Sequence, residues 1–213
     1  MTDDEQSDHT PWSEVVDGIR TGDLMLSSGS GLEDTVIKDL TGGRFSHAGM
    51  LTRSSPAASP LYWEESVIGR AFDPRTHDTH GGAQLGDALT IAQKMIDNEM
   101  QVFYVRLEWN RPDDLDAELD TILDDLDHHL PFMLGWHGVD MAFDYFEGHL
   151  LHHLWHPERM FCSELVAATL QRLGLLSEQE PPNYYSPSSF TSDLALGFGA
   201  QFTEPVALRV PAS

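Results

Sequence analysis

The single cysteine, Cys162, is the side chain in this 213-residue sequence best suited to nucleophilic chemistry. It lies in the segment FCSELVAATL, residues 161–170, where an apolar helical pattern begins. A thiol attacks as its thiolate, and a helix N-terminus or a nearby imidazolium lowers its pKa from the usual value of about 8.5. Free cysteines are also common as small buried core residues. The position alone therefore leaves two interpretations open, a core thiol and a nucleophile.

A histidine and two glutamates lie far upstream in segments that predict a β-hairpin. His47 begins the predicted strand 46–53, and Glu64 and Glu65 lie in the predicted partner strand 61–68. A histidine that acts as a base needs an acceptor that fixes its tautomer and orientation. Neighbouring residues on a strand face opposite ways, so only one of the two glutamates can point at His47. The pattern predicts a base and an orienting acid but does not choose between them.

The elements that must position these residues follow an α+β order. The sequence predicts strands over 23–28, 46–53, 61–68, 101–109 and 205–210, helices over 31–43, 88–96, 112–130, 138–154 and 162–174, and a long loop over 69–84. Such an order is typical of an antiparallel sheet packed against helices. We expect an acidic N-terminal tail over 1–12 and a single domain over 13–213.

Composition narrows the range of partners. The net charge of −23 would repel nucleic acids, and it fits either high solubility or adaptation to high salt. No apolar run approaches the roughly 20 residues that span a bilayer. The N-terminus has no apolar segment typical of a signal peptide. We therefore expect a cytoplasmic protein, or one delivered or packaged without a signal peptide, for example in a virion.

Metal and cofactor signatures are weak. One cysteine excludes a zinc site built from several thiolates. His149 with His153, and His152 with His156, have the i,i+4 spacing of a metal helix, but no HExxH pattern or third ligand accompanies them. Surface or packing roles are favoured for these histidines, and the glycine-containing segments match no nucleotide fingerprint. We predict no metal and no cofactor.

Four segments together resemble a known family. GDLMLSSGS (22–30), FSHAGM (45–50), YWEES (62–66) and FCSELV (161–166) are similar to the permuted NlpC/P60 papain-like cysteine hydrolases of the YiiX/YebB-like group, and the likeness covers about residues 22–190. It implies a papain-like α+β fold, circularly permuted because the histidine precedes the cysteine, with the cysteine at a helix N-terminus. Phe45 and Phe161 stand where many members have tyrosine.

The resemblance also implies roles for individual residues. Cys162 would be the nucleophile, His47 the base and Glu65 the acid, since the acid of the family precedes a small residue, here Ser66. Asp23 matches an aspartate that is more typical of a structural role. The implied activity is hydrolysis of an amide or ester bond, through a thioester, in a peptide, an isopeptide, a cell-wall peptide or a lipid-like substrate. Two alternatives remain: a thiol acyltransferase, and a non-catalytic module within a larger particle such as a virion or secretion apparatus.

Overall fold

The computed structural model of the chain describes residues 9–66, 69–127 and 160–211. The strands are β1 (Thr10–Pro11), β2 (Leu24–Ser28), β3 (His47–Thr52), β4 (Leu61–Ser66), β5 (Gly82–Asp87), β6 (Gln101–Val105), β7 (Leu107–Glu108), β8 (Gln201–Phe202) and β9 (Val206–Arg209). The helices are α1 (Trp12–Val15), α2 (Leu32–Thr41), α3 (Ala88–Asp97), α4 (Leu115–Leu126) and α6 (Cys162–Arg172), with short 3₁₀ helices η1 (Val16–Gly18), η2 (Pro182–Tyr184) and η3 (Pro187–Ser189).

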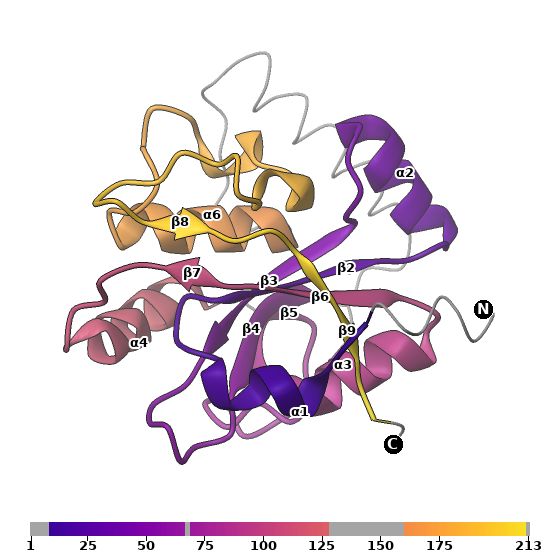
Figure 1. Cartoon of the computed structure of the whole chain (residues 1–213), viewed down its shortest axis with the longest axis horizontal. Helices are drawn as coiled ribbons and strands as arrows, with labels where there is room; N and C mark the ends of the chain where they lie inside the picture. Colours follow the sequence, from indigo (N-terminus) through magenta and orange to yellow (C-terminus); the bar gives the residue numbers. More distant parts are fainter. Residues whose placement is uncertain (1–8, 67–68, 128–159, 212–213) are drawn as a thin grey trace.

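One seven-stranded sheet organises the molecule (Figure 1). Its strand order is β1-β9-β6-β2-β3-β4-β5, and all neighbours are antiparallel except β1 and β9. β7 and β8 form a separate two-stranded sheet. With helices on the sheet, this is the α+β class that the sequence predicts.

Two hydrophobic cores lie on opposite faces of the sheet, because successive strand residues point to opposite sides. One core joins residues such as Met50 and Trp63 to α4 and α6 through Leu119 and Leu165. The other joins residues such as Met25, Leu51 and Tyr62 to α3 through Ile91. In Figure 1, α6 lies above the sheet and α1 and α3 lie below it. The strands in the middle of the sheet are therefore buried on both faces.

Local chemistry fixes the ends of several elements. α2 ends at Gly42, whose left-handed φ of 62° suits glycine. α3 begins after Asp87, whose side chain accepts the backbone N–H of Thr90. The predicted leucine stripe of α4 is buried, including Leu115 and Leu119, while its acidic residues face outward. These elements agree with the predicted helices to within a few residues.

Two differences from the predicted elements have clear physical causes. The predicted loop 69–84 ends early, because residues 82–87 form β5 and pair with β4. Gly86 is required there, since a Cβ would come 2.6 Å from the Cβ of Ala71. Glycine is unfavourable within strands, so the local sequence indicates β5 only weakly, and the strand forms by pairing with β4. Thr10 and Pro11, assigned by the sequence to the tail, form β1 beside β9. The predicted helix 138–154 lies outside the described residues.

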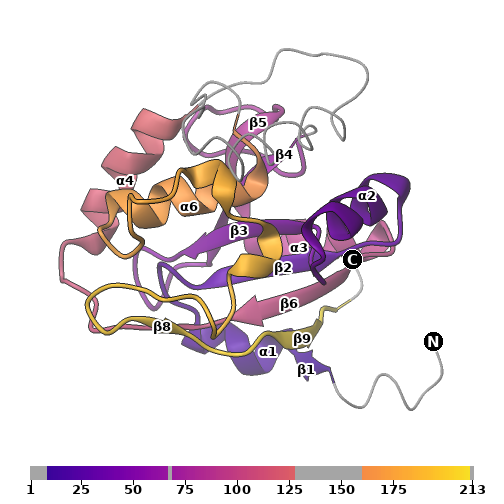
Figure 2. The ribbon, with the colours of Figure 1, turned by 90° about the horizontal axis from the view of Figure 1, so that it is seen from above.

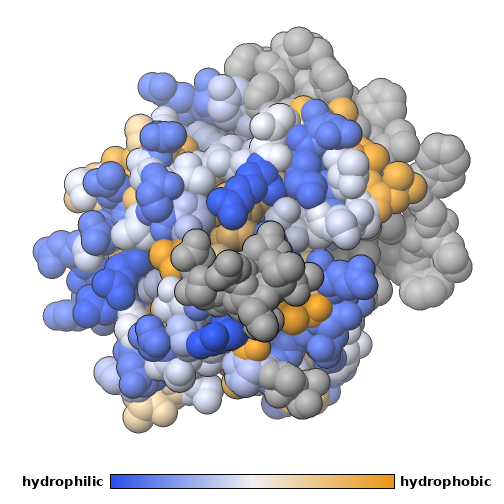
Figure 3. Space-filling view, turned by 45° about the vertical axis from the view of Figure 1, so that its right-hand side comes forward, coloured by the Kyte–Doolittle hydropathy of each residue, from blue (hydrophilic) through white to orange (hydrophobic). Residues whose placement is uncertain are grey.

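The surface agrees with the acidic composition. The face shown in Figure 3 is mostly hydrophilic, with hydrophobic residues in small separate patches. Within the described residues, no helix is long and apolar enough to cross a membrane.

Candidate active site

His47 is the first residue of β3, and its imidazole is held between two neighbouring groups. Register pairs it with Ser27 of β2, so its backbone is part of the sheet. Its Nε2 lies 2.6 Å from Oε2 of Glu64 on β4. The imidazole also interacts with the sulfur of Cys162, through charge and a side-chain hydrogen bond. The ring is therefore oriented by a carboxylate and directed to a thiol.

Glu64, and not Glu65, is the carboxylate that contacts His47. The register of β3 and β4 pairs Met50 with Trp63, which places the side chains of His47 and Glu64 on the same face of the sheet. The adjacent Glu65 consequently points to the opposite face. The expectation that Glu65 orients the histidine is corrected on this point, and the alternative left open by the strand pattern is the one that the structure adopts.

Arg70 contacts both Glu64 and His47, and it was not identified from the sequence as a residue of the site. Its Nη1 lies 2.6 Å from Oε2 of Glu64 and 3.4 Å from Nε2 of His47. It follows β4 in a loop, where no periodic pattern indicates which way a side chain points. The sequence offers one weak indication that an arginine could matter here: lysines and arginines are scarce, 12 against 35 aspartates and glutamates. Arg70 supplies the positive charge that a buried carboxylate needs.

Cys162 is the first residue of α6, as the sequence predicts. The carbonyl of Phe161 accepts the first helical hydrogen bond, from Leu165. The thiol is buried, with 6% of the residue exposed. Its sulfur accepts hydrogen bonds from the backbone N–H groups of Ala48 and Ser163. A helix N-terminus and two amide donors therefore favour the thiolate.

The charges of the site are mutually supporting. Burial opposes the charge on the His47 imidazolium, but the Cys162 thiolate and the hydrogen bond to Glu64 outweigh it and raise the pKa of His47 to about 10. Burial disfavours the thiolate, but His47 and the amide donors lower the pKa of Cys162 below its usual value. Burial also raises the pKa of Glu64, yet Arg70 and His47 bring it below the ordinary value. These shifts in pKa favour the thiolate–imidazolium form of Cys162 and His47.

Gly49 allows the ring of Tyr62 to lie across the sheet beside this cluster. A Cβ on Gly49 would come 2.4 Å from the Tyr62 ring and 2.6 Å from the carbonyl oxygen of Trp63. The Tyr62 hydroxyl donates to the carbonyl of Met25, at 2.9 Å. The side chain thereby fills the space behind His47, with the two ring centroids 6.5 Å apart.

A pocket adjoins the first turn of α6. It is open to solvent, spans about 350 Å³ with that open space included, and is lined by residues of α2, this turn and the segment that carries η2 and η3. Figure 2 shows the ribbon from the side on which α2 and α6 lie. Phe161 and Ser163, the two neighbours of Cys162 in sequence, both line it. Its apolar lining includes Ile37 and Leu40, and a buried carboxyl group, that of Glu164, borders it.

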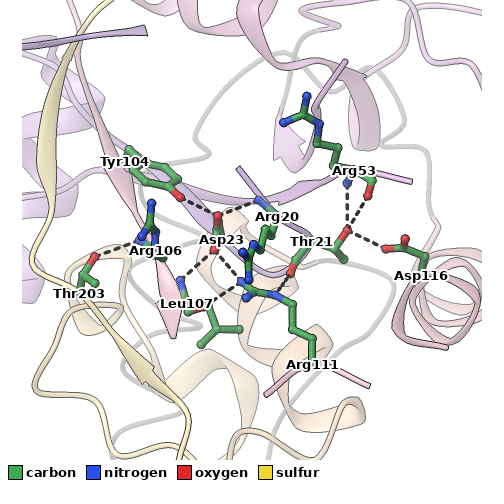
Figure 4. Close-up of polar contacts among 10 residues, drawn as sticks. All are labelled: Arg20, Thr21, Asp23, Arg53, Tyr104, Arg106, Leu107, Arg111, Asp116 and Thr203. Carbon is green, nitrogen blue, oxygen red and sulfur yellow. Dashed lines mark hydrogen bonds and ion pairs between the residues drawn. The ribbon is translucent and has the colours of Figure 1, made fainter. Parts of the chain in front are cut away.

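Asp23 forms a separate polar cluster in the sheet (Figure 4). Its Oδ2 accepts from the backbone N–H of Arg20 at 2.9 Å and from the Tyr104 hydroxyl at 2.6 Å. Its Oδ1 accepts from the backbone N–H of Leu107 at 2.9 Å and from Nη2 of Arg111 at 2.8 Å. These contacts tie β2 to β6 and β7, so Asp23 is a structural residue.

The structure describes His80 but none of the four histidines considered for metal binding. Nδ1 of His80 lies 2.8 Å from Oδ1 of Asp78, and its Nε2 lies 2.9 Å from the carbonyl oxygen of Ala83. Both oxygens accept, and the contacts attach the loop to β5. No group of three or more potential metal ligands occurs among the described residues. His149, His152, His153 and His156 lie outside them.

Comparisons with known proteins find one distant structural likeness to report. No protein family matches the sequence, and no curated protein matches it. Among solved structures, the metalloprotein YiiX of Escherichia coli O157:H7, DUF1105, is similar at 18% identity and a TM-score of 0.44. The similarity covers 71% of this chain and 64% of YiiX, less than two thirds of that protein.

Proposed function

We propose that the protein is a thiol hydrolase that cleaves an amide or ester bond. Cys162 is the nucleophile, His47 the general base and acid, and Glu64 the carboxylate that orients His47. One observation carries the proposal: the imidazole of His47 interacts with the Cys162 sulfur and lies 2.6 Å from the Glu64 carboxylate. A nucleophile in contact with a base, and the base in contact with an orienting group, is a general solution for acyl transfer.

The reaction follows from these groups. The Cys162 thiolate attacks the carbonyl carbon, and the carbonyl π electrons move to oxygen. Collapse of this intermediate breaks the bond to the leaving nitrogen or oxygen, which takes the proton of the His47 imidazolium. Neutral His47 then removes a proton from water, the resulting hydroxide attacks the thioester, and the acid product leaves with return of the thiolate. Glu64 stabilises the imidazolium without accepting its proton.

The chain order His47, Glu64, Cys162 supports a circularly permuted papain-like arrangement as part of the same proposal. In this arrangement the strand that bears the base precedes the helix that bears the nucleophile. An α+β fold whose cysteine opens a helix packed on an antiparallel sheet is compatible with it.

The pocket beside Cys162 supports a substrate with a small apolar group next to the scissile carbonyl. Ile37 and Leu40 offer apolar contact, while the Glu164 carboxyl group and the net charge of −23 disfavour an anion. We expect 4-nitrophenyl butyrate to be a better substrate than mono-4-nitrophenyl succinate, whose acyl chain is similar in length but ends in a carboxylate. Equal kcat/KM values for the two esters would exclude this role for the pocket.

The test of the function itself is a burst experiment with 4-nitrophenyl butyrate. Wild-type protein should release about one equivalent of nitrophenolate rapidly, and intact-mass and peptide mass spectrometry should locate a butyryl group on Cys162. Cys162→Ala should give neither. Absence of a burst from folded wild-type protein, or an adduct at another residue, would refute the proposal. Peptide, isopeptide and lipid amide libraries then identify the natural leaving group.

A further inference from the structure

Glu65 is a buried carboxyl group that the proposed reaction does not yet use. It is only 7% exposed, and it lies on the opposite face of β4 from Glu64. That face carries Trp63 and packs against α6, the helix that Cys162 opens. Glu65 therefore faces the layer that contains the nucleophile.

The pairing of β3 with β4, the two strands beside the site, ends just before Glu65. β3 and β4 pair from Thr52 with Leu61 to Met50 with Trp63. Ala48 and Glu65 lie beyond this paired segment, and the backbone N–H of Ala48 donates to the Cys162 sulfur. If the register of β3 and β4 continued, Glu65 would lie directly opposite Ala48. The sulfur is thus adjacent to the end of the pairing, with Glu65 on the second strand.

Glu65 lacks the partners that keep Glu64 ionised. The groups that act on it do so through charge: the Cys162 thiolate, His47, Glu64 and Arg70. Within the described ranges no residue donates a hydrogen bond to its carboxyl group, and the Nη1 of Arg70 is directed to Glu64. Burial, and next the neighbouring thiolate, raise the pKa of Glu65 well above its usual value. Burial and the nearby thiolate thus favour the protonated form of Glu65, whose O–H can donate a hydrogen bond.

We propose that Glu65 is a further catalytic residue, whose carboxylic O–H donates a hydrogen bond to the substrate carbonyl oxygen as it becomes an oxyanion. The backbone N–H of Cys162, at the free N-terminus of α6, is the second donor. A neutral acid suits this task, because it stabilises developing negative charge without carrying charge of its own. No proton leaves Glu65, and the hydrogen bond shortens as the carbon becomes tetrahedral. This role rests on the proposed hydrolase function.

Two reactions of Cys162 separate the role from a structural one. Iodoacetamide alkylates the thiolate by displacement and forms no oxyanion, whereas 4-nitrophenyl butyrate acylates it through one. Glu65→Leu should keep the alkylation rate within about threefold of wild type, while the acylation rate falls about 100-fold, the usual cost of losing one oxyanion donor. Glu65→Gln, whose amide still donates, should keep acylation within about tenfold.

The outcomes are distinct. Acylation by Glu65→Leu at the wild-type rate, a parallel fall of both reactions, or a Gln variant no better than Leu would overturn the role of Glu65 and leave the hydrolase proposal standing. If Cys162 of the wild-type protein is not acylated, both the role of Glu65 and the hydrolase proposal are refuted. Circular dichroism and thermal unfolding establish that each variant is folded, and Glu65→Met, which is closer in shape, replaces Glu65→Leu if that variant does not fold.

Discussion

Asp23 and Glu64 are both carboxylates with no exposed side-chain surface, and each pairs with an arginine, but their surroundings differ in one respect. Asp23 accepts four hydrogen bonds, two on each oxygen. Glu64 accepts from His47 and from Arg70, both on Oε2. Its Oε1 is buried and has no hydrogen-bond partner among the described residues.

The difference distinguishes a carboxylate that holds elements together from one to which we assign a role in the proposed reaction. The donors on Asp23 come from four residues and are already in place, so its charge is spread over fixed contacts. The contacts of Glu64 are directed to a single imidazole and the arginine beside it. Buried acceptors are normally satisfied, and a catalytic role is one of the reasons for which a native structure keeps an unsatisfied one.

The largest expected effect comes from removing the imidazole that links Glu64 to the thiol. His47→Ala should lower kcat/KM for 4-nitrophenyl butyrate about 1,000-fold, because both the base and the charge that favours the thiolate are lost. Rates of ester hydrolysis and of iodoacetamide alkylation at pH 6.5 measure the two losses. Asp23→Asn is the matched control, and an alkylation rate unchanged in His47→Ala would show that the histidine does not activate Cys162.

The next effect distinguishes the adjacent glutamates. Glu64→Gln should reduce ester hydrolysis about 100-fold, because a neutral amide supports the imidazolium less well. Glu65→Gln should stay within about tenfold, since its amide still donates. Steady-state kinetics of the two variants at one pH settle the comparison, and a greater loss in Glu65→Gln would make Glu65 the orienting acid.

A third effect concerns stability and leaves the thiol unchanged. Asp23→Asn places an NH₂ group against at least one of four donors, which leaves a buried donor unsatisfied. The free energy of unfolding in urea should fall by about 2 kcal/mol. The iodoacetamide rate of the folded variant should remain within about twofold of wild type. A tenfold slower rate would mean that the Asp23 cluster also positions the active site.

The smallest effect is a change in the shape of a pH profile. The lowered pKa of Cys162 makes the thiolate available below the ordinary range, and the imidazolium persists until His47 loses its proton near pH 10. The alkylation rate of wild-type protein should therefore rise clearly less between pH 7 and pH 9 than that of an ordinary thiol. An ordinary thiol with a pKa near 8.5 changes about twentyfold over that interval.

The same profile tests the pair directly. His47→Ala should regain the steep dependence of an ordinary thiol, and Asp23→Asn should keep the shallower one. A steep wild-type profile would contradict the thiolate–imidazolium pair.

The sequence was sufficient for those features that depend on local pattern. The start of α6 at Cys162, the β3–β4 hairpin and the structural role of Asp23 agree with the sequence predictions. The choice of Glu64 depends on register, which the hairpin sets through its pairing of Met50 with Trp63. Alternation of polar and apolar residues usually reveals register. Here residues 62–66 are all buried, so β4 has no solvent-facing side to reveal it.

Arg70 and β5 depended on contacts between distant segments. Arg70 comes to His47 from a loop 23 residues further along the chain. β5 contains Gly82 and Gly86 and becomes a strand by pairing with β4. Neither feature has a periodic signal of its own, because tertiary pairing supplies the order that the local sequence lacks.

The single cysteine of the 213-residue chain has a consequence for redox damage. A thiolate of lowered pKa is the form that peroxides oxidise to sulfenic acid. With no second cysteine in the sequence, Cys162 has no resolving thiol that could trap this state as an intramolecular disulfide. Recovery then requires an external thiol such as glutathione to reach a sulfur in a residue that is 6% exposed, and further oxidation to the sulfinic acid would remove the thiolate permanently.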